Sequence, residues 1–192
     1  MVERTDQPNG LVWGYHGTSD RFAEAHIRRG MPHTTFPGDW LGHGAYFWEG
    51  DFTRAAMWAE DRVVPRFGGQ PVVLAAVIDL SDCLDLTRVD DRQFIQTLAA
   101  RAYDEITAEG MAGLRQDEMW RELDCRVIEY TLRNTLRKDG TPRFTTIRGA
   151  FQEGRPLHSS PEGAQSFIRE LDHIQINVVD RGALQSLSVV NL

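Results

Sequence analysis

Residues 40–49 form the densest group of chemically distinctive side chains in the sequence. Gly42 and Gly44 permit backbone angles that are closed to other residues, and they let a ligand approach the main chain closely. Tyr46 follows them in a short apolar segment that predicts a buried strand. Asp51 can then cap a helix. A glycine turn, an aromatic strand and a capped helix predict the rim of a ligand pocket, or else a very tight core.

Two other segments carry polar side chains in predicted strands. His16 and Gly17 close a strand expected over residues 11–16, and Gln175 lies in a strand-like segment near the C-terminus, residues 173–179. Taken alone, each of these residues is more often structural than functional. Their order along the chain, an imidazole, a phenol and a carboxamide, is what indicates a functional site.

These segments resemble the catalytic domain of the diphtheria-toxin-like, poly(ADP-ribose) polymerase-like ADP-ribosyltransferases. The resemblance rests on His-Gly-Thr at residues 16–18, on Gly-x-Gly-x-Tyr-Phe at residues 42–47, which leads into an alanine-rich helix, and on Gln175 in a C-terminal strand. It covers nearly the whole chain. It implies an α+β fold in which a split antiparallel β-sheet, with a helical insertion, surrounds an NAD cleft.

The resemblance also implies a function. The protein would be a mono-ADP-ribosyltransferase, a glycosyltransferase of the pentosyl-transferring kind, which cleaves the nicotinamide–ribose bond of NAD and passes ADP-ribose to a protein or nucleic-acid acceptor. NAD is the implied substrate. No metal ion is expected, because His33 and His43 have no further ligands at close spacing. A bacterial toxin or defence effector, with a cognate inhibitor as a partner, fits this compact layout.

Cleavage of NAD passes through a ribose that carries developing positive charge, so an enzyme gains by orienting the nicotinamide and stabilising the sugar. By resemblance, His16 would bond a ribose hydroxyl and the Gly17 backbone would hold the carboxamide. Tyr46 would stack on the nicotinamide ring, and Gln175 would bond the nicotinamide ribose. The residues expected to contact NAD are His16, Gly17, Thr18, Gly44, Tyr46, Thr53, Trp58 (or Met57, its neighbour) and Gln175, of which His16, Tyr46 and Gln175 would be catalytic.

Gln175 departs from the family, which often has glutamate at this position. A glutamate can accept a proton from an incoming hydroxyl, whereas an amide forms hydrogen bonds but cannot ionise. Gln175 therefore predicts single transfers rather than chain elongation. A carboxylate of the preceding loop could serve the acceptor instead, and the candidates are Glu153, Glu162 and Asp172.

The pattern of apolar and turn residues predicts a single domain over residues 11–192 after a disordered lead-in at residues 1–10. Helices are expected at residues 21–29, after Asp51, at 90–109 and 116–138, and briefly at 165–169; the pair within residues 90–139 is the insertion. Strands are expected at residues 11–16, 45–48, 71–80, 173–179 and 184–190, with a hairpin turn at residues 180–182 between the last two. Residues 144–151 alternate weakly and are expected to form either a strand or a connector.

Composition narrows the class of protein. With 192 residues, of which 41% are hydrophobic and 26% charged, the chain can bury one core without disulfides. Cys83 and Cys125 lack metal-like spacing and are expected to be free and buried. The net charge of -7 argues against a broad nucleic-acid surface. No membrane span or signal-peptide core is apparent, which predicts a cytoplasmic protein, or an effector delivered without a conventional signal peptide.

Two other functions stay open from the sequence. A relative that uses NAD could act as an NAD glycohydrolase or as an RNA 2′-phosphotransferase, although the latter needs several basic groups and the acidic balance counts against it. A module that binds NAD or ADP-ribose without turnover is the alternative from a different class, and Gln175 keeps it open.

Overall fold

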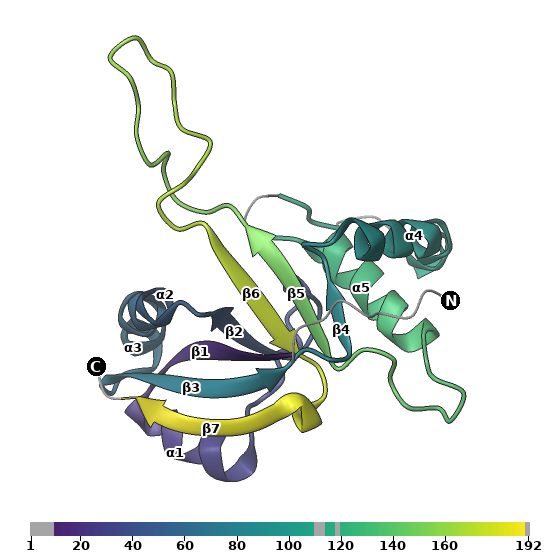
Figure 1. Cartoon of the computed structure of the whole chain (residues 1–192), viewed down its shortest axis with the longest axis horizontal. Helices are drawn as coiled ribbons and strands as arrows, with labels where there is room; N and C mark the ends of the chain where they lie inside the picture. The colour runs from purple at the N-terminus through teal and green to yellow at the C-terminus, as the bar shows by residue number, and fades with distance from the viewer. Residues whose placement is uncertain (1–9, 110–113, 118–119, 191–192) are drawn as a thin grey trace.

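The computed structural model of the chain describes residues 10–109, 114–117 and 120–190. Its strands are β1 (Leu11–Ser19), β2 (Ala45–Glu49), β3 (Pro71–Asp79), β4 (Cys83–Asp85), β5 (Thr146–Phe151), β6 (His173–Val178) and β7 (Leu184–Val190). They form one sheet in the order β4-β5-β6-β2-β1-β3-β7 (Figure 1), antiparallel throughout except between β4 and β5. The predicted α+β class is confirmed. The lead-in expected at residues 1–10 lies outside the described residues, apart from Gly10.

The helices are α1 (Asp20–Arg29), α2 (Phe52–Trp58), α3 (Val64–Phe67), α4 (Val89–Glu109) and α5 (Glu122–Asn134). A π-helical turn (Ala59–Val63) joins α2 to α3 in one continuous stretch. Asp51 caps α2 as predicted, because its Oδ1 accepts a hydrogen bond from the Arg54 amide at 2.9 Å. Of the helices described, none has the length and apolar content needed to cross a membrane.

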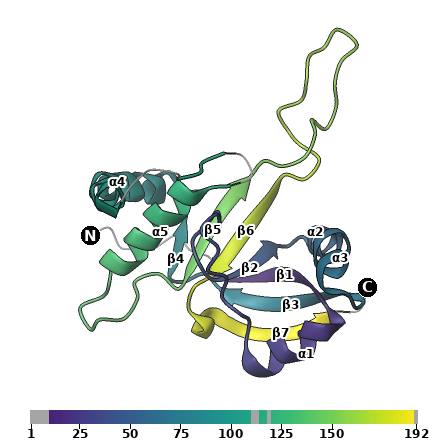
Figure 2. The same cartoon turned by 180° about the vertical axis from the view of Figure 1, so that it is seen from behind.

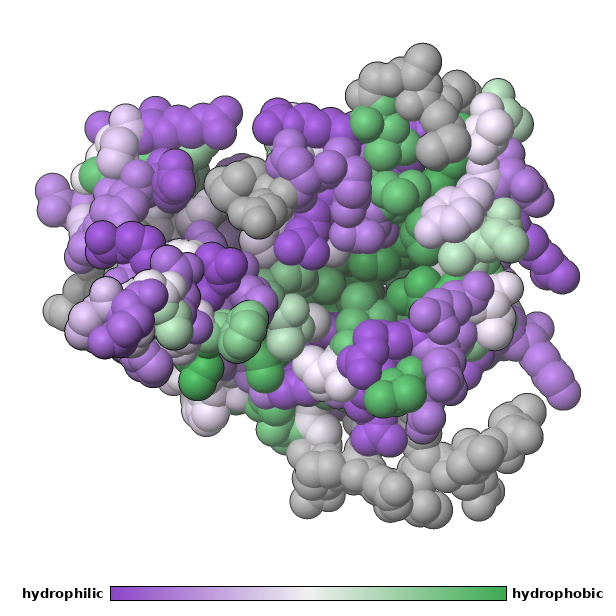
Figure 3. Space-filling model, turned by 90° about the horizontal axis from the view of Figure 1, so that it is seen from above, coloured by the Kyte–Doolittle hydropathy of each residue, from purple (hydrophilic) through white to green (hydrophobic). Residues whose placement is uncertain are grey.

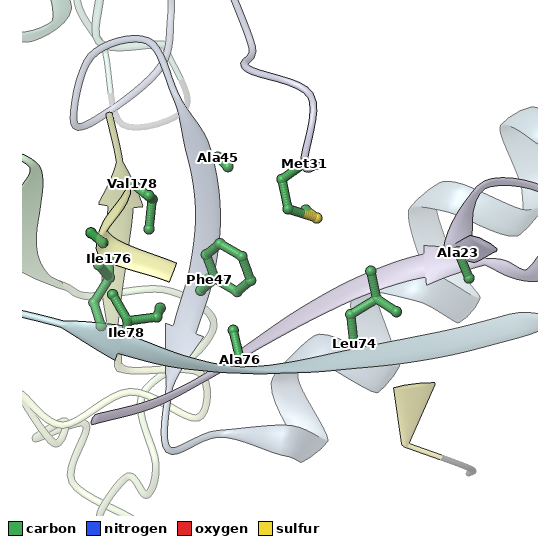
Figure 4. Close-up of a cluster of buried hydrophobic side chains, with 10 residues drawn as sticks. Ala23, Met31, Ala45, Phe47, Leu74, Ala76, Ile78, Ile176 and Val178 are labelled. Carbon is green, nitrogen blue, oxygen red and sulfur yellow. The ribbon is translucent and has the colours of Figure 1, made fainter. Parts of the chain in front are cut away.

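Hydrophobic clusters lie on both faces of the sheet. On one face, Phe47 and Ile176 pack with Met31 and with Ala23 of α1 (Figure 4). On the other face, Ile128 of α5 packs against Leu41, Leu84, Phe144, Ile147 and Phe151. Seen from above, a hydrophobic region near the middle of the molecule is surrounded by hydrophilic side chains (Figure 3). Both faces at the centre of the sheet therefore contribute to the core.

The path of β7 contradicts the hairpin predicted at residues 180–182. β6 already pairs with β5 on one side and with β2 on the other, so neither of its edges is free for β7. The Asp180 side chain instead accepts a hydrogen bond from the Gly182 amide at 2.8 Å, within a short 3-10 turn (Arg181–Ala183). This turn sends β7 to the far edge of the sheet, where it pairs with β3.

The helix predicted at residues 116–138 is too long at both ends. Gln116 forms a β-bridge with Arg121 just before α5, and Leu136 forms another with Pro142 just after it. The main-chain groups of these flanks therefore pair across local turns instead of along a helix.

Residues 152–172 form an arm that projects away from the body between β5 and β6 (Figures 1 and 2). The short helix predicted at residues 165–169 does not form. The two halves of the arm pair with each other instead, for example through a bridge between Pro156 and Arg169. The reversal at its tip contains Gly163, whose positive φ of 93° suits a turn.

Candidate functional site

β1 and β2 separate in the middle of the sheet. β1 pairs with β3 along its whole length but with β2 at two positions, of which the second is Tyr15, opposite Trp48. Beyond Tyr15, the edge of β1 at residues 16–19 faces the edge of β2 at residues 45–47, and no ladder joins these described residues. We call this gap in the ladder the split.

The Gly17 peptide groups face the split. The Trp13 carbonyl oxygen accepts a hydrogen bond from the Gly50 amide at 2.8 Å, which places the polar main-chain groups of Trp13 on the β2 side of β1. Every second residue of a strand presents its N–H and C=O to the same side, so those of Gly17 point the same way. A ligand in the split would meet one donor and one acceptor of a single residue.

The three predicted catalytic side chains lie on two faces of the sheet. Tyr46 and Gln175 share the face of Trp48, because Trp48 pairs with Gln175 and Tyr46 is two residues away on β2. Tyr15 is on that face too, and therefore His16, the next residue, lies on the opposite one. The structure thus brings Tyr46 and Gln175 together, and His16 meets them only across the split.

His16 bridges the split. Its Nδ1 lies 2.8 Å from the Tyr46 carbonyl oxygen, and because a carbonyl can only accept, Nδ1 carries the hydrogen. Burial lowers the pKa of His16 to about 4; the hydrogen bond to Tyr46 opposes this shift, and the nearby His26 adds to it. The ring is therefore neutral at pH 7, and its Nε2 keeps a lone pair that can accept a hydrogen bond.

We expect this neutral histidine to make the fold sensitive to acid. Its folded pKa of about 4 lies below the 6.5 of free histidine, so the unfolded chain takes up the extra proton first and stability falls as the pH drops from 6.5 towards 4. Between pH 6.5 and 5 the loss is about 2 kcal/mol. Urea unfolding at pH 7 and pH 5 compares the wild type with His16→Asn, whose amide can still donate to Tyr46 but does not titrate. Between the two pH values, the free energy of unfolding of the variant should fall by about 2 kcal/mol less than that of the wild type. Equal losses would contradict the conclusion that His16 is neutral in the folded protein.

Tyr46 holds the glycine turn, residues 41–44, against the sheet. Its hydroxyl accepts a hydrogen bond from the Leu41 amide at 2.8 Å and donates one to the Gly42 carbonyl at 2.7 Å. Burial raises the pKa of Tyr46 well above its ordinary value. Asn177, opposite Tyr46 on β6, donates to carbonyl oxygens of the same turn. The turn is therefore fixed by the core of the protein, and a stacking role for the Tyr46 ring stays a prediction.

Gln175 is half-buried on β6, with Trp48 opposite it on β2 and Gly149 opposite it on β5. The ring of Trp58 on α2 lies 5.7 Å from that of Trp48, centre to centre. This position favours Trp58 over Met57 as the residue of α2 that would contact the nicotinamide ring. Trp48 was not among the predicted contact residues. Its position two residues after Tyr46 in the same strand is the signal that could have identified it.

A buried polar cluster lies beside Gln175 on the same face. We name it the Arg54 cluster, and it consists of Trp48, Arg54, Glu153 and His173. Arg54 donates a hydrogen bond to Glu153 at 2.7 Å, and its guanidinium carbon lies 5.4 Å from the centre of the Trp48 ring. Nδ1 of His173 lies 3.8 Å from the same Glu153 oxygen. Of these four residues, only Glu153 was predicted from the sequence to belong to the site. His173 could have been identified too, because it lies two residues before Gln175 in the same strand and therefore on the same face.

The chain shows no similarity to the known proteins with which it was compared. Comparison of the chain with models of known protein families and with curated protein sequences gave no match. The function has to be inferred from the side chains of the split and of the Arg54 cluster.

The remaining predicted residues lie at the edges of this site or away from it. Thr18 is buried on the face of His16, and Thr53 is exposed on α2. Gly44 packs its backbone against Asn177. Of the loop carboxylates other than Glu153, Glu162 is exposed near the tip of the arm, and Asp172 accepts a hydrogen bond from the Arg169 amide at 2.9 Å within the arm.

His43, Cys83 and Cys125 are the side chains that bear on metal-ion and cysteine chemistry in the described part of the chain. Within it, no group of three or more His, Cys, Asp or Glu side chains could hold a metal ion. Nδ1 of His43 lies 3.7 Å from Glu129. Cys83 and Cys125 are buried thiols that form no disulfide bond, as predicted. Burial raises the pKa of each thiol to about 12, so neither is a nucleophile at neutral pH.

Proposed function

We propose that the protein is an NAD-dependent mono-ADP-ribosyltransferase with the split-sheet fold of that family, and that NAD binds across the split. The observation that carries the proposal is the divergence of β1 and β2 directly after Tyr15, which leaves the Gly17 peptide groups facing a gap bordered by His16 and Tyr46. A dinucleotide that crosses this gap can contact both faces of the sheet. The placement of His16 on the opposite face from Gln175 is then compatible with one ligand.

The groups at the split match the polar parts of NAD. The N–H and C=O of Gly17 complement a primary carboxamide, which offers one acceptor and donor hydrogens in the same plane. Nε2 of His16 is an acceptor for a ribose hydroxyl, because Nδ1 holds the hydrogen. Trp58, which is 38% exposed on α2, offers an aromatic face for the nicotinamide ring.

Gln175 would act on the nicotinamide ribose from the Trp48 side. As the nicotinamide–ribose bond breaks, its electron pair moves to the nicotinamide ring and positive charge develops on the sugar. The Gln175 amide can hold a ribose hydroxyl, orient the sugar and stabilise this charge, but it cannot remove a proton from an acceptor. Single transfers to an acceptor that is already strongly nucleophilic fit this limit. A role as a toxin or defence effector, with a macromolecular acceptor, belongs to the same proposal.

Incubation with NAD that carries a label in its ADP-ribose part tests the proposal, with and without cell lysate. Label that moves to protein or nucleic acid supports the transferase. Nicotinamide release without transfer of label would indicate a glycohydrolase, and binding by calorimetry without either would indicate a binding module. A protein that neither binds nor cleaves NAD would refute the assignment of the split as an NAD site.

We expect His16→Ala to lower kcat/KM for NAD cleavage by about 100-fold, because it removes both the acceptor for the ribose and the bridge to Tyr46 that sets the spacing of the split. Nicotinamide release at several NAD concentrations measures the effect. His26→Ala is the matched control: its ring lies 6.0 Å from that of His16, but it belongs to α1 and not to the split. Control activity as low as that of His16→Ala would point to a general loss of packing.

A further inference from the structure

A pocket opens beside the glycine turn, between that turn and helices α4 and α5. Its volume is about 290 Å³, near the lower end of the range for small-molecule sites. Apolar walls come from Pro37, from Ile106 of α4 and from Cys125 of α5. Among the described residues that line the pocket, none is expected to contact NAD. The pocket is therefore a candidate site separate from the split.

Two arginines of α5 line the pocket, and each is paired with a glutamate. Arg126 donates a hydrogen bond at 3.1 Å to Glu122, one turn earlier on α5. Arg133 donates one at 2.6 Å to Glu105 of α4. The positive charges in the wall are therefore already offset. An anionic ligand would have to displace a glutamate from one of the two arginines.

Glu129, also on α5, gives one end of the pocket a negative charge. Its Oε1 accepts a hydrogen bond from the His43 amide at 2.7 Å, and its Oε2 lies 3.7 Å from Nδ1 of the same residue. No Arg or Lys nitrogen of the described chain lies within 4.0 Å of this carboxylate. Asp39 is close as well, since burial and, to a smaller extent, repulsion from Glu129 raise the pKa of Asp39. A cation is therefore the ligand that this end of the pocket favours.

The surroundings of Glu129 indicate what kind of cation can bind. Its side chain is 22% exposed, so a ligand can reach it from solvent although most of its surface is shielded. A protonated amine offers three N–H donors and a compact positive charge, which suits a carboxylate. Tyr130 lines the pocket too, and an aromatic ring attracts a cation that lies over its face. A short hydrocarbon chain would suit the walls at Pro37 and Ile106.

We propose that this pocket is a second ligand site, which binds a small aliphatic amine in its protonated form through an ion pair with Glu129. The inference goes beyond the proposed NAD site and does not depend on it. The amine would bond Oε2 of Glu129, because Oε1 already holds the His43 amide. Its binding would strengthen the contact between α5 and the glycine turn, since the same carboxylate takes part in both interactions.

Calorimetric titration of the full chain with putrescine at pH 7 tests the site. 1,4-Butanediol is the matched compound, because it has the same carbon chain with hydroxyl groups in place of the amines. Sodium chloride keeps the ionic strength equal in the two titrations. Putrescine should bind at one site per chain and at least about tenfold more tightly than butanediol, because hydrogen bonds between charged groups are stronger than neutral ones.

Glu129→Gln tests the ion pair. The amide oxygen of glutamine can still accept the hydrogen bond from the His43 N–H, but the negative charge is lost. The affinity for putrescine should fall by at least about tenfold. Glu24→Gln is the matched control, because it makes the same substitution in an exposed ion pair with Arg28 on α1, and it should bind putrescine as the wild type does.

The comparison of putrescine with butanediol uses the wild type, so it decides the matter even if Glu129→Gln does not fold. Equal affinities for the two compounds, no binding of putrescine at millimolar concentrations, or an unchanged affinity in Glu129→Gln would each overturn the amine site. These results leave the assignment of the split untouched. A protein that binds putrescine through Glu129 but neither binds nor cleaves NAD would keep the amine site and lose the proposed function.

Discussion

Asn177→Asp is expected to lower the free energy of unfolding by about 4 kcal/mol at pH 7, among the largest effects for a single substitution. The Asn177 side chain is completely buried, and its Nδ2 donates to the carbonyl oxygens of Leu41, Gly42 and His43 at 2.8, 3.1 and 3.1 Å. A carboxylate has no hydrogen to donate. It would face these carbonyl oxygens as an unpaired buried charge, and the glycine turn would lose its anchor on β6.

Denaturant unfolding at pH 7 and pH 5 measures this loss. Burial would raise the folded pKa of the introduced carboxyl group above its unfolded value, so the folded state binds more protons and the deficit should shrink as the pH falls. Asn134→Asp is the matched control, since Asn134 also donates to a carbonyl oxygen, that of Tyr130 at 2.8 Å, but at an exposed position of α5. It should cost no more than about 1 kcal/mol. A buried variant as stable as the control would show that Asn177 does not hold the turn.

Features that depend on local interactions could be predicted from the sequence. Asp51 caps the helix that follows it, because a side-chain oxygen and an amide three residues away meet in any such turn. The unbroken apolar run at residues 71–80 predicted a strand, and β3 forms there. The motif residues His16, Tyr46 and Gln175 all lie in strands, as predicted.

The faces and partners of those strands depend on distant interactions that the sequence does not display. The face of His16 follows from the register between Tyr15 and Trp48, and a shift of one residue would have reversed it. The hairpin at residues 180–182 is excluded because β6 has no free edge, which only the full sheet reveals. The face on which a strand residue lies, and the strand that its own strand pairs with, are determined by tertiary pairing and not by the periodicity of the sequence.

The Arg54 cluster shows the same limitation at the level of single side chains. In the sequence, Arg54 is one more charged residue in the first turns of a helix. It is buried because Glu153, ninety-nine positions later in the chain, supplies a hydrogen-bonded carboxylate at 2.7 Å. Burial of a charge requires such a partner. The base of the arm therefore determines the environment of Gln175, although the arm itself has little regular structure.

Gly17→Ala is expected to remove about 3 kcal/mol of stability and to reduce NAD cleavage by at least about 100-fold. A methyl group on Gly17 would overlap the carbonyl oxygen of Ala55 and lie 2.9 Å from the Ala59 nitrogen. Both atoms belong to the helical backbone of α2 and its π-helical extension, which cannot rotate away as a side chain could. The helix must therefore move off β1 and carry Arg54 and Trp58 with it.

Thermal unfolding and nicotinamide release measure the two effects of Gly17→Ala on the same preparation. Gly182→Ala is the matched control, because the added methyl group would come no closer than 3.2 Å, to a side-chain oxygen of Asp180. It should keep wild-type stability and activity. The Gly17 variant links fold to function directly, since this residue both lets α2 approach β1 and presents its peptide groups to the split. A variant that cleaves NAD at the wild-type rate would mean that the chemistry takes place elsewhere, whatever happens to its stability.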